Sequence, residues 1–493
     1  MKMRSDIVWV LGGRVVSAMV SIASLRLLTS FLQPADFGLY TLLIAFQGFC
    51  GLILLSPVGL HLNRNTHAWW DDGSLTKRLS GYNNYIVFIS AGIAIVVAFW
   101  WNFYPGTDQS LTGTLLSAMA VSLMVYFGTW NGTVVYILNM LGFRSASVCW
   151  MLSTSIVGLA FSAYLSYNYP TGISWLLGQA IGMAVGAVGG GMMLRRYIKN
   201  ENNLKTVETE PISLIDKKTI IKFCLPLAMA TGLMWIQTAG YRFWIGGVWG
   251  AKELGLLAIG LSITAQIWAI VEAVSMQFLS PYFFRHITES KSASENSAIL
   301  SNVINVMWPL YAVLAGFNFV FASSLLVVLT NELYYASVAF VTLGVIVEFS
   351  RCTANLWSYA AQIERNTTNY ILPYGIGALA VWIGLIWVNQ RQGDINHISV
   401  VLASSGLLMC MAMVIVMQRM VRVKLDVWRW MIGIVTLLVC AASAIIAPIT
   451  STNFLECIEL MALGFLMAGG VVMLLLWRNP ALTALLSIGL RKA

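Results

Sequence analysis

The sequence predicts an all-α polytopic membrane protein with about 14 transmembrane helices. Of its 493 residues, 58% are hydrophobic and only 10% are charged. The apolar residues gather in stretches near the roughly 20 residues that a helix needs to cross the hydrocarbon core. These stretches are 7–30, 37–58, 82–101, 111–138, 146–168, 174–194, 222–248, 254–279, 298–323, 336–361, 370–389, 398–418, 429–447 and 456–477.

The basic residues predict the orientation of these spans. Nearly all of the 29 Lys and Arg residues fall in every second gap, whereas the alternate gaps hold only Lys252 and Arg391. The positive-inside rule places the rich gaps in the cytoplasm. We therefore expect a protein of the cell (inner) membrane with cytoplasmic N- and C-termini. The first span begins like a signal peptide, but Arg14 interrupts it and no small-residue cleavage site follows, so we expect it to be retained.

Composition also limits the classes of partner that the protein is expected to bind. The formal net charge is +9, but the cations line one face of a membrane, where anionic headgroups attract them. We therefore expect membrane lipids, and no nucleic acid, as partners. The seven cysteines show no CxxC spacing, and the segment from His61, HLNRNTHAWWDDGSL, matches no zinc pattern. We expect no metal or cofactor, and we expect this segment to lie on the cytoplasmic membrane surface.

An internal repeat predicts two related bundles. After Arg26 the chain reads RLLTSFLQPADFGLY, and after Arg242 it reads RFWIGGVWGAKELGL, so that Gly38 and Gly255 lie 217 residues apart. A second similarity places Arg144 opposite Arg365 at an offset of 221 residues. Six helices per repeat give both copies the same orientation, with a central cavity at their interface. We expect an N-terminal six-helix bundle at 1–194, a cytoplasmic linker at 195–221, a C-terminal six-helix bundle at 222–418 and two additional helices with a cytoplasmic tail at 419–493.

Four cations lie inside predicted spans. They are Arg14, Arg26, Arg242 and Arg351, and each would cost about 3 kcal/mol if it faced lipid. A guanidinium holds phosphate oxygens bidentately and stays protonated, so these residues are candidates for an anion-binding path. The alternative is structural, because an intramembrane Arg can bond backbone carbonyls, pair with an acid or extend to the interface.

Two carboxylates also lie well within predicted spans. Glu348 precedes Arg351 by three residues, so the two share a helical face and we expect them to pair. Glu272 lies in the eighth span. Buried carboxylates of this kind can bind and release H⁺ or Na⁺ in an antiporter, and the alternative is a structural ion pair.

Trp130 and Asn131 lie in the middle of the fourth span rather than at its ends. Most other aromatic residues near the predicted span ends are explained by an interfacial belt. Trp130 and Asn131 are therefore candidates for substrate contact, with ordinary helix packing as the alternative.

These features together resemble a known family. The segment RLLTSFLQPADFGLY, the seventh helix opening KFCLPLAMATGL with Pro226, the GFR turn and the fourteen spans are similar to the polysaccharide-transport branch of the multidrug/oligosaccharidyl-lipid/polysaccharide (MOP) exporter superfamily, and within it to Wzx-like flippases.

The resemblance implies a V-shaped pair of six-helix lobes around a cationic cavity. It implies a flippase that moves a polyprenyl-diphosphate-linked oligosaccharide, such as an O-antigen, capsule or exopolysaccharide repeat unit, to the outer leaflet by alternating access. Polysaccharide polymerase or synthase components would then be partners.

Two other functions compete with this one. A cation-coupled multidrug antiporter shares the superfamily fold, but cationic drugs favour an acidic cavity, whereas the spans hold four Arg against two Glu. A membrane enzyme of polysaccharide assembly needs catalytic groups on a folded extramembrane platform. The outer gaps, such as PGTDQS and RQGDINH, are too short for one, so we expect a protein that is not an enzyme.

The charge distribution makes the orientation testable. In a cysteine-free background, Asn200→Cys should react with a membrane-impermeant thiol reagent only after the cells are opened, because the linker is expected inside. Gln392→Cys, in an expected outer loop, should react in intact cells. Labelling of Asn200→Cys in intact cells would overturn the predicted orientation.

Overall fold

The computed structural model describes residues 2–104, 106–202, 217–289, 293–364, 366–449, 451–480 and 482–483, and these contain helices and no strands. Thirteen helices among the described residues are long and apolar enough to cross a membrane. They correspond to every predicted span except 222–248, which is helical as three shorter consecutive segments. The protein is thus an all-helical, multi-pass membrane protein. The middle of the predicted linker and Arg365 lie outside the described residues.

The contacts divide the chain into two compact units, Met1–Gly255 and Leu256–Ala493. Unit 1 takes in α8, η2 and α9, because α8 packs against α3 and η1. The boundaries that the repeat predicts, with a linker at 195–221, remain a prediction. Unit 1 contains α1 (Lys2–Phe31), α2 (Pro34–Phe49), η1 (Cys50–Leu55), α3 (Ser56–Asp71), α4 (Leu75–Phe103), α5 (Leu111–Met140), α6 (Arg144–Asn168), α7 (Gly172–Asn202), α8 (Lys217–Trp235), η2 (Ile236–Gly240), α9 (Tyr241–Val248) and the first turn of α10.

Unit 2 is a second helical bundle, in which α13 and α14 both pack on α15, and α11 packs on α13 and α16. Its members are α10 (Ala251–Glu289), α11 (Ala293–Val320), α12 (Ala322–Leu329), η3 (Glu332–Ser337), α13 (Val338–Ile363), η4 (Thr367–Tyr370), α14 (Ile371–Gln390), α15 (Ile395–Met420), α16 (Val427–Ile446) and α17 (Phe454–Leu476). The short helix α12 lies in a gap for which the sequence predicted no separate helix.

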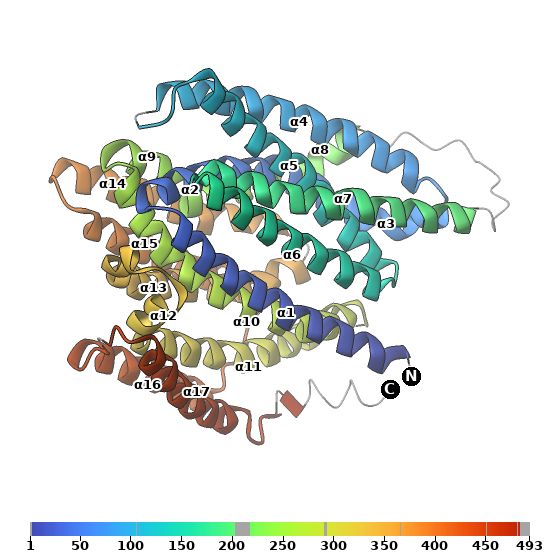
Figure 1. Ribbon diagram of the computed structural model, residues 1–493. Coiled ribbons are helices and arrows are strands. Elements are labelled where there is room, and N and C mark those ends of the chain that lie inside the picture. The colour runs from blue at the N-terminus through green and yellow to red at the C-terminus, as the bar shows by residue number, and fades with distance from the viewer. Residues whose placement is uncertain are drawn as a thin grey trace. The chain divides into compact units, whose positions relative to one another are not determined.

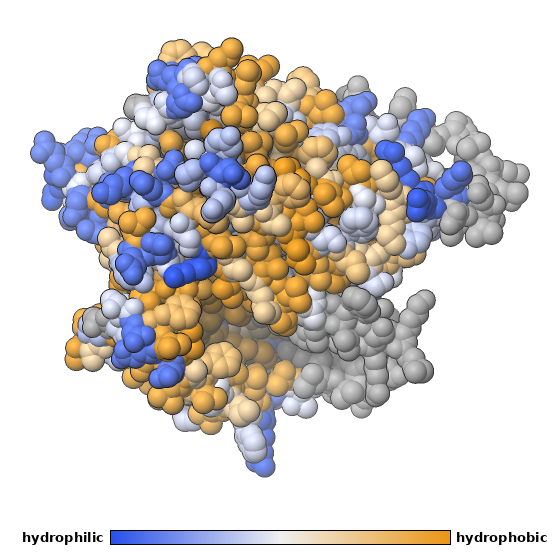
Figure 2. All heavy atoms as spheres, in the orientation of Figure 1, coloured by the Kyte–Doolittle hydropathy of each residue, from blue (hydrophilic) through white to orange (hydrophobic). Residues whose placement is uncertain are grey.

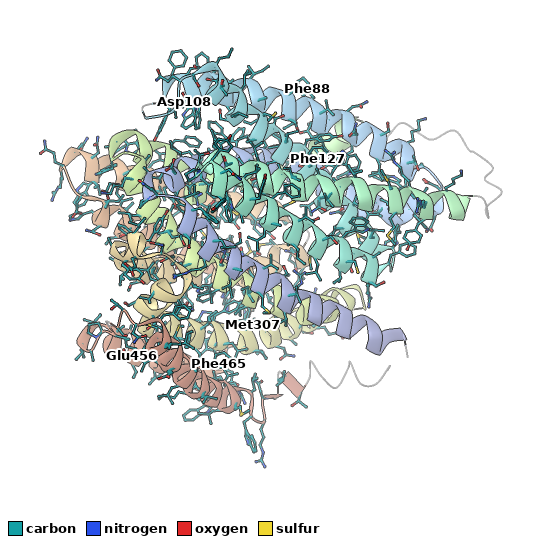
Figure 3. The ribbon with its side chains drawn as sticks, viewed as in Figure 1. Phe88, Asp108, Phe127, Met307, Glu456 and Phe465 are labelled. Atoms are coloured by element: carbon teal, nitrogen blue, oxygen red, sulfur yellow. The ribbon has the colours of Figure 1, made fainter. Side chains whose placement is uncertain are left out.

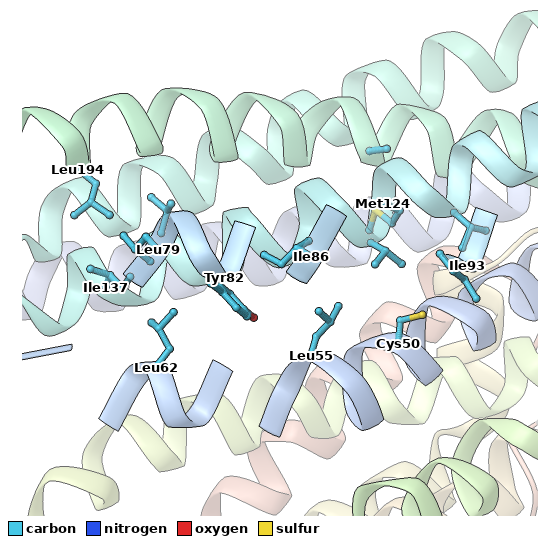
Figure 4. Close-up of a cluster of buried hydrophobic side chains, with 14 of the residues drawn as sticks. Cys50, Leu55, Leu62, Leu79, Tyr82, Ile86, Ile93, Met124, Ile137 and Leu194 are labelled. Carbon is cyan, nitrogen blue, oxygen red and sulfur yellow. The ribbon is translucent and has the colours of Figure 1, made fainter. Parts of the chain in front are cut away.

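The core of unit 1 is built where α2, η1 and α3 face α4, α5 and α7. Cys50, Leu55, Tyr82, Ile86 and Met124 point toward one another across these helices, and all are buried (Figure 4). In Figure 2 the hydrophilic residues of unit 1 gather at the ends of its helices, and the stretch between them is mostly apolar. This is the distribution that a lipid bilayer requires of a helical bundle.

A π-helical turn interrupts the second span. The π-helix η1 ends at Leu55, two residues before Pro57, whose ring lacks an N–H and crowds the carbonyl four residues earlier. Such turns leave backbone carbonyls without their usual partners, which is costly in hydrocarbon. Here Thr231 of α8 donates to the Leu52 carbonyl at 2.7 Å, and Tyr85 of α4 donates to the Leu54 carbonyl at 2.8 Å.

The segment from His61 is helical and continues the second span, because α2, η1 and α3 follow one another without a break from Pro34 to Asp71. Its location on the cytoplasmic membrane surface remains a prediction. Trp69 is buried and lies 5.6 Å from the guanidinium carbon of Arg78. The ring of Trp70 contacts that of Phe143. Aromatic packing inside unit 1 therefore accounts for this tryptophan pair.

The two glycines that define the repeat lie against each other. A Cβ on Gly38 would lie 1.9 Å from the carbonyl oxygen of Ala251, and a Cβ on Gly255 would lie 1.8 Å from the carbonyl oxygen of Pro34. Ala251 follows Pro34 by 217 residues, the same offset that separates the glycines. The contact is therefore reciprocal between positions that the predicted repeat relates.

Within unit 2 the two C-terminal helices pack on α11, and α17 also packs on α12. Asn305 of α11 donates to the Lys424 carbonyl at 2.8 Å and accepts from the Asp426 amide at 2.9 Å, which fixes the chain before α16. Trp308 stacks on Trp430 with ring centroids 3.8 Å apart. Outside these contacts α16 and α17 expose most of their side chains, and Phe465 of α17 is labelled on such a surface in Figure 3.

The glycine contact predicts a stability effect. Gly38→Ala places a methyl group against backbone, so the helices must separate, and we expect a loss of about 1–3 kcal/mol in the free energy of unfolding. Gly92→Ala is the matched control, because a Cβ there meets nothing within 4 Å. Thermal unfolding of the purified protein measures both variants. A Gly38→Ala protein as stable as Gly92→Ala would contradict the close contact.

Candidate functional site

The strongest cluster of charge inside the described spans lies in unit 2. The Nε of Arg351 on α13 donates to Glu348 Oε2 at 2.7 Å, and its Nη1 donates to Glu272 Oε2 of α10 at 3.1 Å. These distances are those of charge-assisted hydrogen bonds. The sequence prediction that Glu348 and Arg351 pair is confirmed. Glu272 joins them as a third member, and we call these three residues the charged triad.

Close packing of α10 on α13 precedes the triad along both helices. A Cβ on Gly260 of α10 would lie 2.5 Å from Phe340 Cβ, and a Cβ on Gly344 of α13 would lie 2.6 Å from Thr264 Oγ1. Because glycine has no side chain, the two backbones approach each other there. The approach brings the side chain of Glu272 within reach of Arg351.

Further polar groups surround the triad. Asn355, one turn beyond Arg351, donates from Nδ2 to Glu272 Oε1 at 3.0 Å. The sequence analysis missed this residue, although its spacing of seven from Glu348 places it on the same face of α13. Tyr311 of α11 and Tyr374 of α14 lie within electrostatic range of Arg351 and Glu272. The site therefore draws side chains from four helices of unit 2.

The triad holds two carboxylates against one guanidinium. Its side chains are largely shielded, with exposures of 29% for Arg351, 21% for Glu272 and 11% for Glu348. With all three groups ionised the net charge is −1, in a region where an uncompensated charge is costly. Such a site can accept a proton or a monovalent cation, and it gives Arg351 two anions before any substrate is present.

Arg14 has a different environment. Its side chain is exposed on α1, and no carboxylate of the described residues forms a salt bridge with it. The adjacent Gly13 faces α6, since a Cβ there would lie 2.4 Å from Val148 Cγ1. Arg14 thus extends from α1 without a counter-charge among the described residues. Whether it faces a central cavity remains a prediction.

Arg26 and Arg242 are both partly buried in unit 1. Arg26 lies 12 residues after Arg14, which is about 18 Å along α1 and about 120° around it. Arg242, in the first turn of α9, donates from Nη1 to the Thr41 carbonyl of α2 at 3.4 Å. Arg242 therefore bonds to a backbone carbonyl, which is one of the three structural roles named for such a residue.

Trp130 and Asn131 point in different directions from α5. Trp130 donates from Nε1 to Asn83 Oδ1 of α4 at 2.8 Å. Asn131 is buried and accepts from Thr154 Oγ1 of α6 at 3.1 Å. A Cβ on Gly186 of α7 would lie 2.1 Å from Asn131 Oδ1, so Asn131 fills a tight space among α5, α6 and α7. The packing alternative fits Asn131 better than a substrate contact does.

No known protein family matches the chain by sequence, and no curated protein matches it either. Solved structures do match its fold. The lipid II flippase MurJ in an inward closed conformation is 12% identical, with a TM-score of 0.61 over 96% of this chain and 99% of that chain. An inward-facing multidrug resistance MATE family transporter of the MOP superfamily is 13% identical, with a TM-score of 0.56 over 85% and 95%.

A MOP superfamily transporter from Pyrococcus furiosus Vc1 (DSM3638) is also similar, at 11% identity with a TM-score of 0.51 over 88% and 94% of the two chains. These proteins are transporters or flippases rather than enzymes. At these identities the similarity concerns the fold. The chain therefore has the fold of the MOP superfamily transporters.

Proposed function

We propose that this protein is a flippase that moves a polyprenyl-diphosphate-linked oligosaccharide from the cytoplasmic to the outer leaflet of the cell membrane by alternating access. The observation that carries the proposal is Arg14, an exposed guanidinium on an apolar helix with no described carboxylate partner. A cation in such a place needs an anion, and a diphosphate is one. The fold supports the proposal, since one protein that shares it is a lipid II flippase.

The diphosphate is the part of the substrate for which transport needs help. Its two negative charges are costly in hydrocarbon, and fixed guanidinium groups lower that cost through paired, charge-assisted hydrogen bonds. Arg14 and Arg26 are placed about 18 Å apart along α1. Arg242 is the third of the predicted intramembrane cations that belong to unit 1. Its Nε is buried with no described hydrogen-bond partner, so it keeps a donor for an anion.

We assign the coupling role to the charged triad. Two carboxylates around Arg351 leave an excess negative charge that one H⁺ or Na⁺ neutralises, so Glu348 and Glu272 would hold the coupling ion. In this assignment Arg351 positions the carboxylates, and its part in substrate binding is weaker than that of Arg14. Trp130 remains a substrate candidate. Polymerase or synthase components would act on the flipped product.

A multidrug antiporter is the second candidate. The specific observation in its favour is the net negative charge of the triad, which could attract an organic cation, together with the similarity to a MATE family transporter. Arg14, which has no carboxylate partner in the described part of the chain, opposes it, because this cation repels cationic drugs.

Substitutions of Arg14 test the anion-binding role. Arg14→Ala should abolish surface polysaccharide at normal protein levels in the membrane. Arg14→Lys should restore it only in part, because lysine keeps the charge but loses the bidentate fork. Export of the polysaccharide is measured in cells whose only copy of the gene carries the variant.

Arg196→Ala is the matched control, since Arg196 is an exposed cation at the end of α7 to which we assign no role. Full export by Arg14→Ala would exclude Arg14 as a substrate contact. Deletion of the gene with unchanged export and lost resistance to cationic drugs would favour the antiporter.

The charged triad predicts that substitutions of its carboxylates affect the ion dependence of transport. Glu272→Gln or Glu348→Gln alone leaves one carboxylate on Arg351, so the protein should fold, but transport should lose its dependence on a pH or Na⁺ gradient. Glu364→Gln, at the exposed end of α13, is the control and should keep that dependence. Gradient-driven transport by both single variants would contradict the coupling role.

The double variant tests the ion pairing itself. Glu272→Gln with Glu348→Gln leaves Arg351 without a carboxylate, which should cost about 3 kcal/mol, the lower end of the range for breaking a buried pair, because Arg351 keeps 29% exposure. Adding Arg351→Gln should recover most of the lost thermal stability. A triple variant as unstable as the double would contradict the pairing.

A further inference from the structure

A groove runs between α4 and α7 on unit 1, apart from the charged triad. Its volume is about 500 Å³. The helix α5 packs against both α4 and α7, so α5 supplies the floor of the groove through Phe127 and Trp130 while the other two helices supply its walls. Phe127 is labelled in Figure 3, next to α7 and beneath α4.

One end of the groove is polar. Thr76 and Ser80 from the first turns of α4 line it, and Arg195 lines it from the last turns of α7. No described residue forms a salt bridge with Arg195, and its side chain is exposed. A guanidinium and two hydroxyls at one end of an open groove form a site complementary to a phosphate group.

Asn83 supplies a fixed donor deeper in the groove. Its Oδ1 accepts from Trp130 Nε1 at 2.8 Å and from Tyr126 Oη at 3.0 Å. Because an indole N–H can only donate, these bonds fix the oxygen of the amide toward α5. The Nδ2 of Asn83 donates to no described protein group. It is free to donate to an oxygen of a ligand in the groove.

The rest of the groove is apolar and open. Val188 and Met192 of α7 line it and are 49% and 57% exposed. Val188 precedes Arg195 by seven residues, which is about 10 Å along α7. Asn83 lies the same number of residues beyond Thr76 on α4. The interfacial layer of a bilayer leaflet is about 5–8 Å thick, so the polar end matches the headgroup level and Val188 matches the acyl chains.

We propose that this groove binds one anionic glycerophospholipid. Its phosphate lies at Arg195 with the hydroxyls of Thr76 and Ser80, an ester carbonyl accepts from Asn83 Nδ2, and one acyl chain follows Met192, Val188 and Phe127. The basic end selects an anionic over a zwitterionic headgroup. The groove shares Trp130 with the proposed substrate contacts, but the phospholipid is held by Arg195, Thr76, Ser80 and Asn83, none of which has a part in the proposed transport function.

Lipid titration of the purified full-length protein tests the headgroup selectivity. Native mass spectrometry should show one phosphatidylglycerol retained in preference to phosphatidylcholine. Arg195→Gln should lower that preference about fivefold, the factor that corresponds to one basic residue at an anionic surface. Arg196→Gln is the matched control, since Arg196 is the next residue but does not line the groove. Equal loss in both variants, or no preference in the wild type, would overturn the proposal.

A second pair of variants tests the groove itself. Gly191 lines it, and a Cβ there meets nothing within 4 Å, so Gly191→Leu fills the groove without a clash at Cβ. We expect this variant to lose the retained phospholipid at unchanged thermal stability. Gly92→Leu on α4 adds the same side chain outside the groove and should retain it. Retention by Gly191→Leu would overturn the proposal.

Competition distinguishes the other anionic lipid that has similar chemistry. Undecaprenyl phosphate at an equal concentration should leave the phosphatidylglycerol bound, because it has no ester carbonyl for Asn83. Displacement of the phospholipid from the wild type, but not from Arg14→Ala, would instead assign the binding to the transport path.

Discussion

The cost of a bare charge in hydrocarbon governs the arrangement of this protein. Glu272, Glu348 and Arg351 come from two helices, yet their carboxylates and guanidinium meet at 2.7 and 3.1 Å. Each group alone would oppose insertion of its helix by about 3 kcal/mol. Their combination leaves a single excess negative charge, which is small enough to be held and large enough to attract an ion.

The same constraint applies to the backbone. The π-helical turn before Pro57 is compatible with a membrane span because Thr231 and Tyr85 donate to the carbonyls of Leu52 and Leu54. A second π-helix, η2, precedes α9, which begins with Tyr241 and Arg242. The irregular turn at η1 is therefore tied to neighbouring helices by side-chain donors from α8 and α4.

The number and order of the spans were predictable because hydrophobic length alone determines which segments can cross a bilayer. The helical course of α3 was not, because charged and aromatic residues after His61 are typical of a membrane surface, and only tertiary contacts such as that of Trp69 with Arg78 show that they pack within unit 1. The Glu348 and Arg351 pair followed from their spacing.

The third member of that cluster, Glu272, is 79 residues from Arg351, and no local pattern reports such a contact. Trp130 and Asn131 show the same limit at the scale of one residue. Adjacent positions on a helix point about 100° apart. The sequence therefore did not indicate that Trp130 lines a groove whereas Asn131 is buried among three helices.

The reciprocal contact of Gly38 and Gly255 gives the predicted repeat a role in helix packing. A duplicated chain places equivalent residues on the two sides of a local two-fold axis, and only glycine lets the backbones meet there without a side chain between them. Gly38 lies against the Ala251 carbonyl and Gly255 lies against the Pro34 carbonyl. Any change in the angle between α2 and α10 therefore alters both contacts equally. Packing at this contact thus accounts for a glycine at both positions of the predicted repeat.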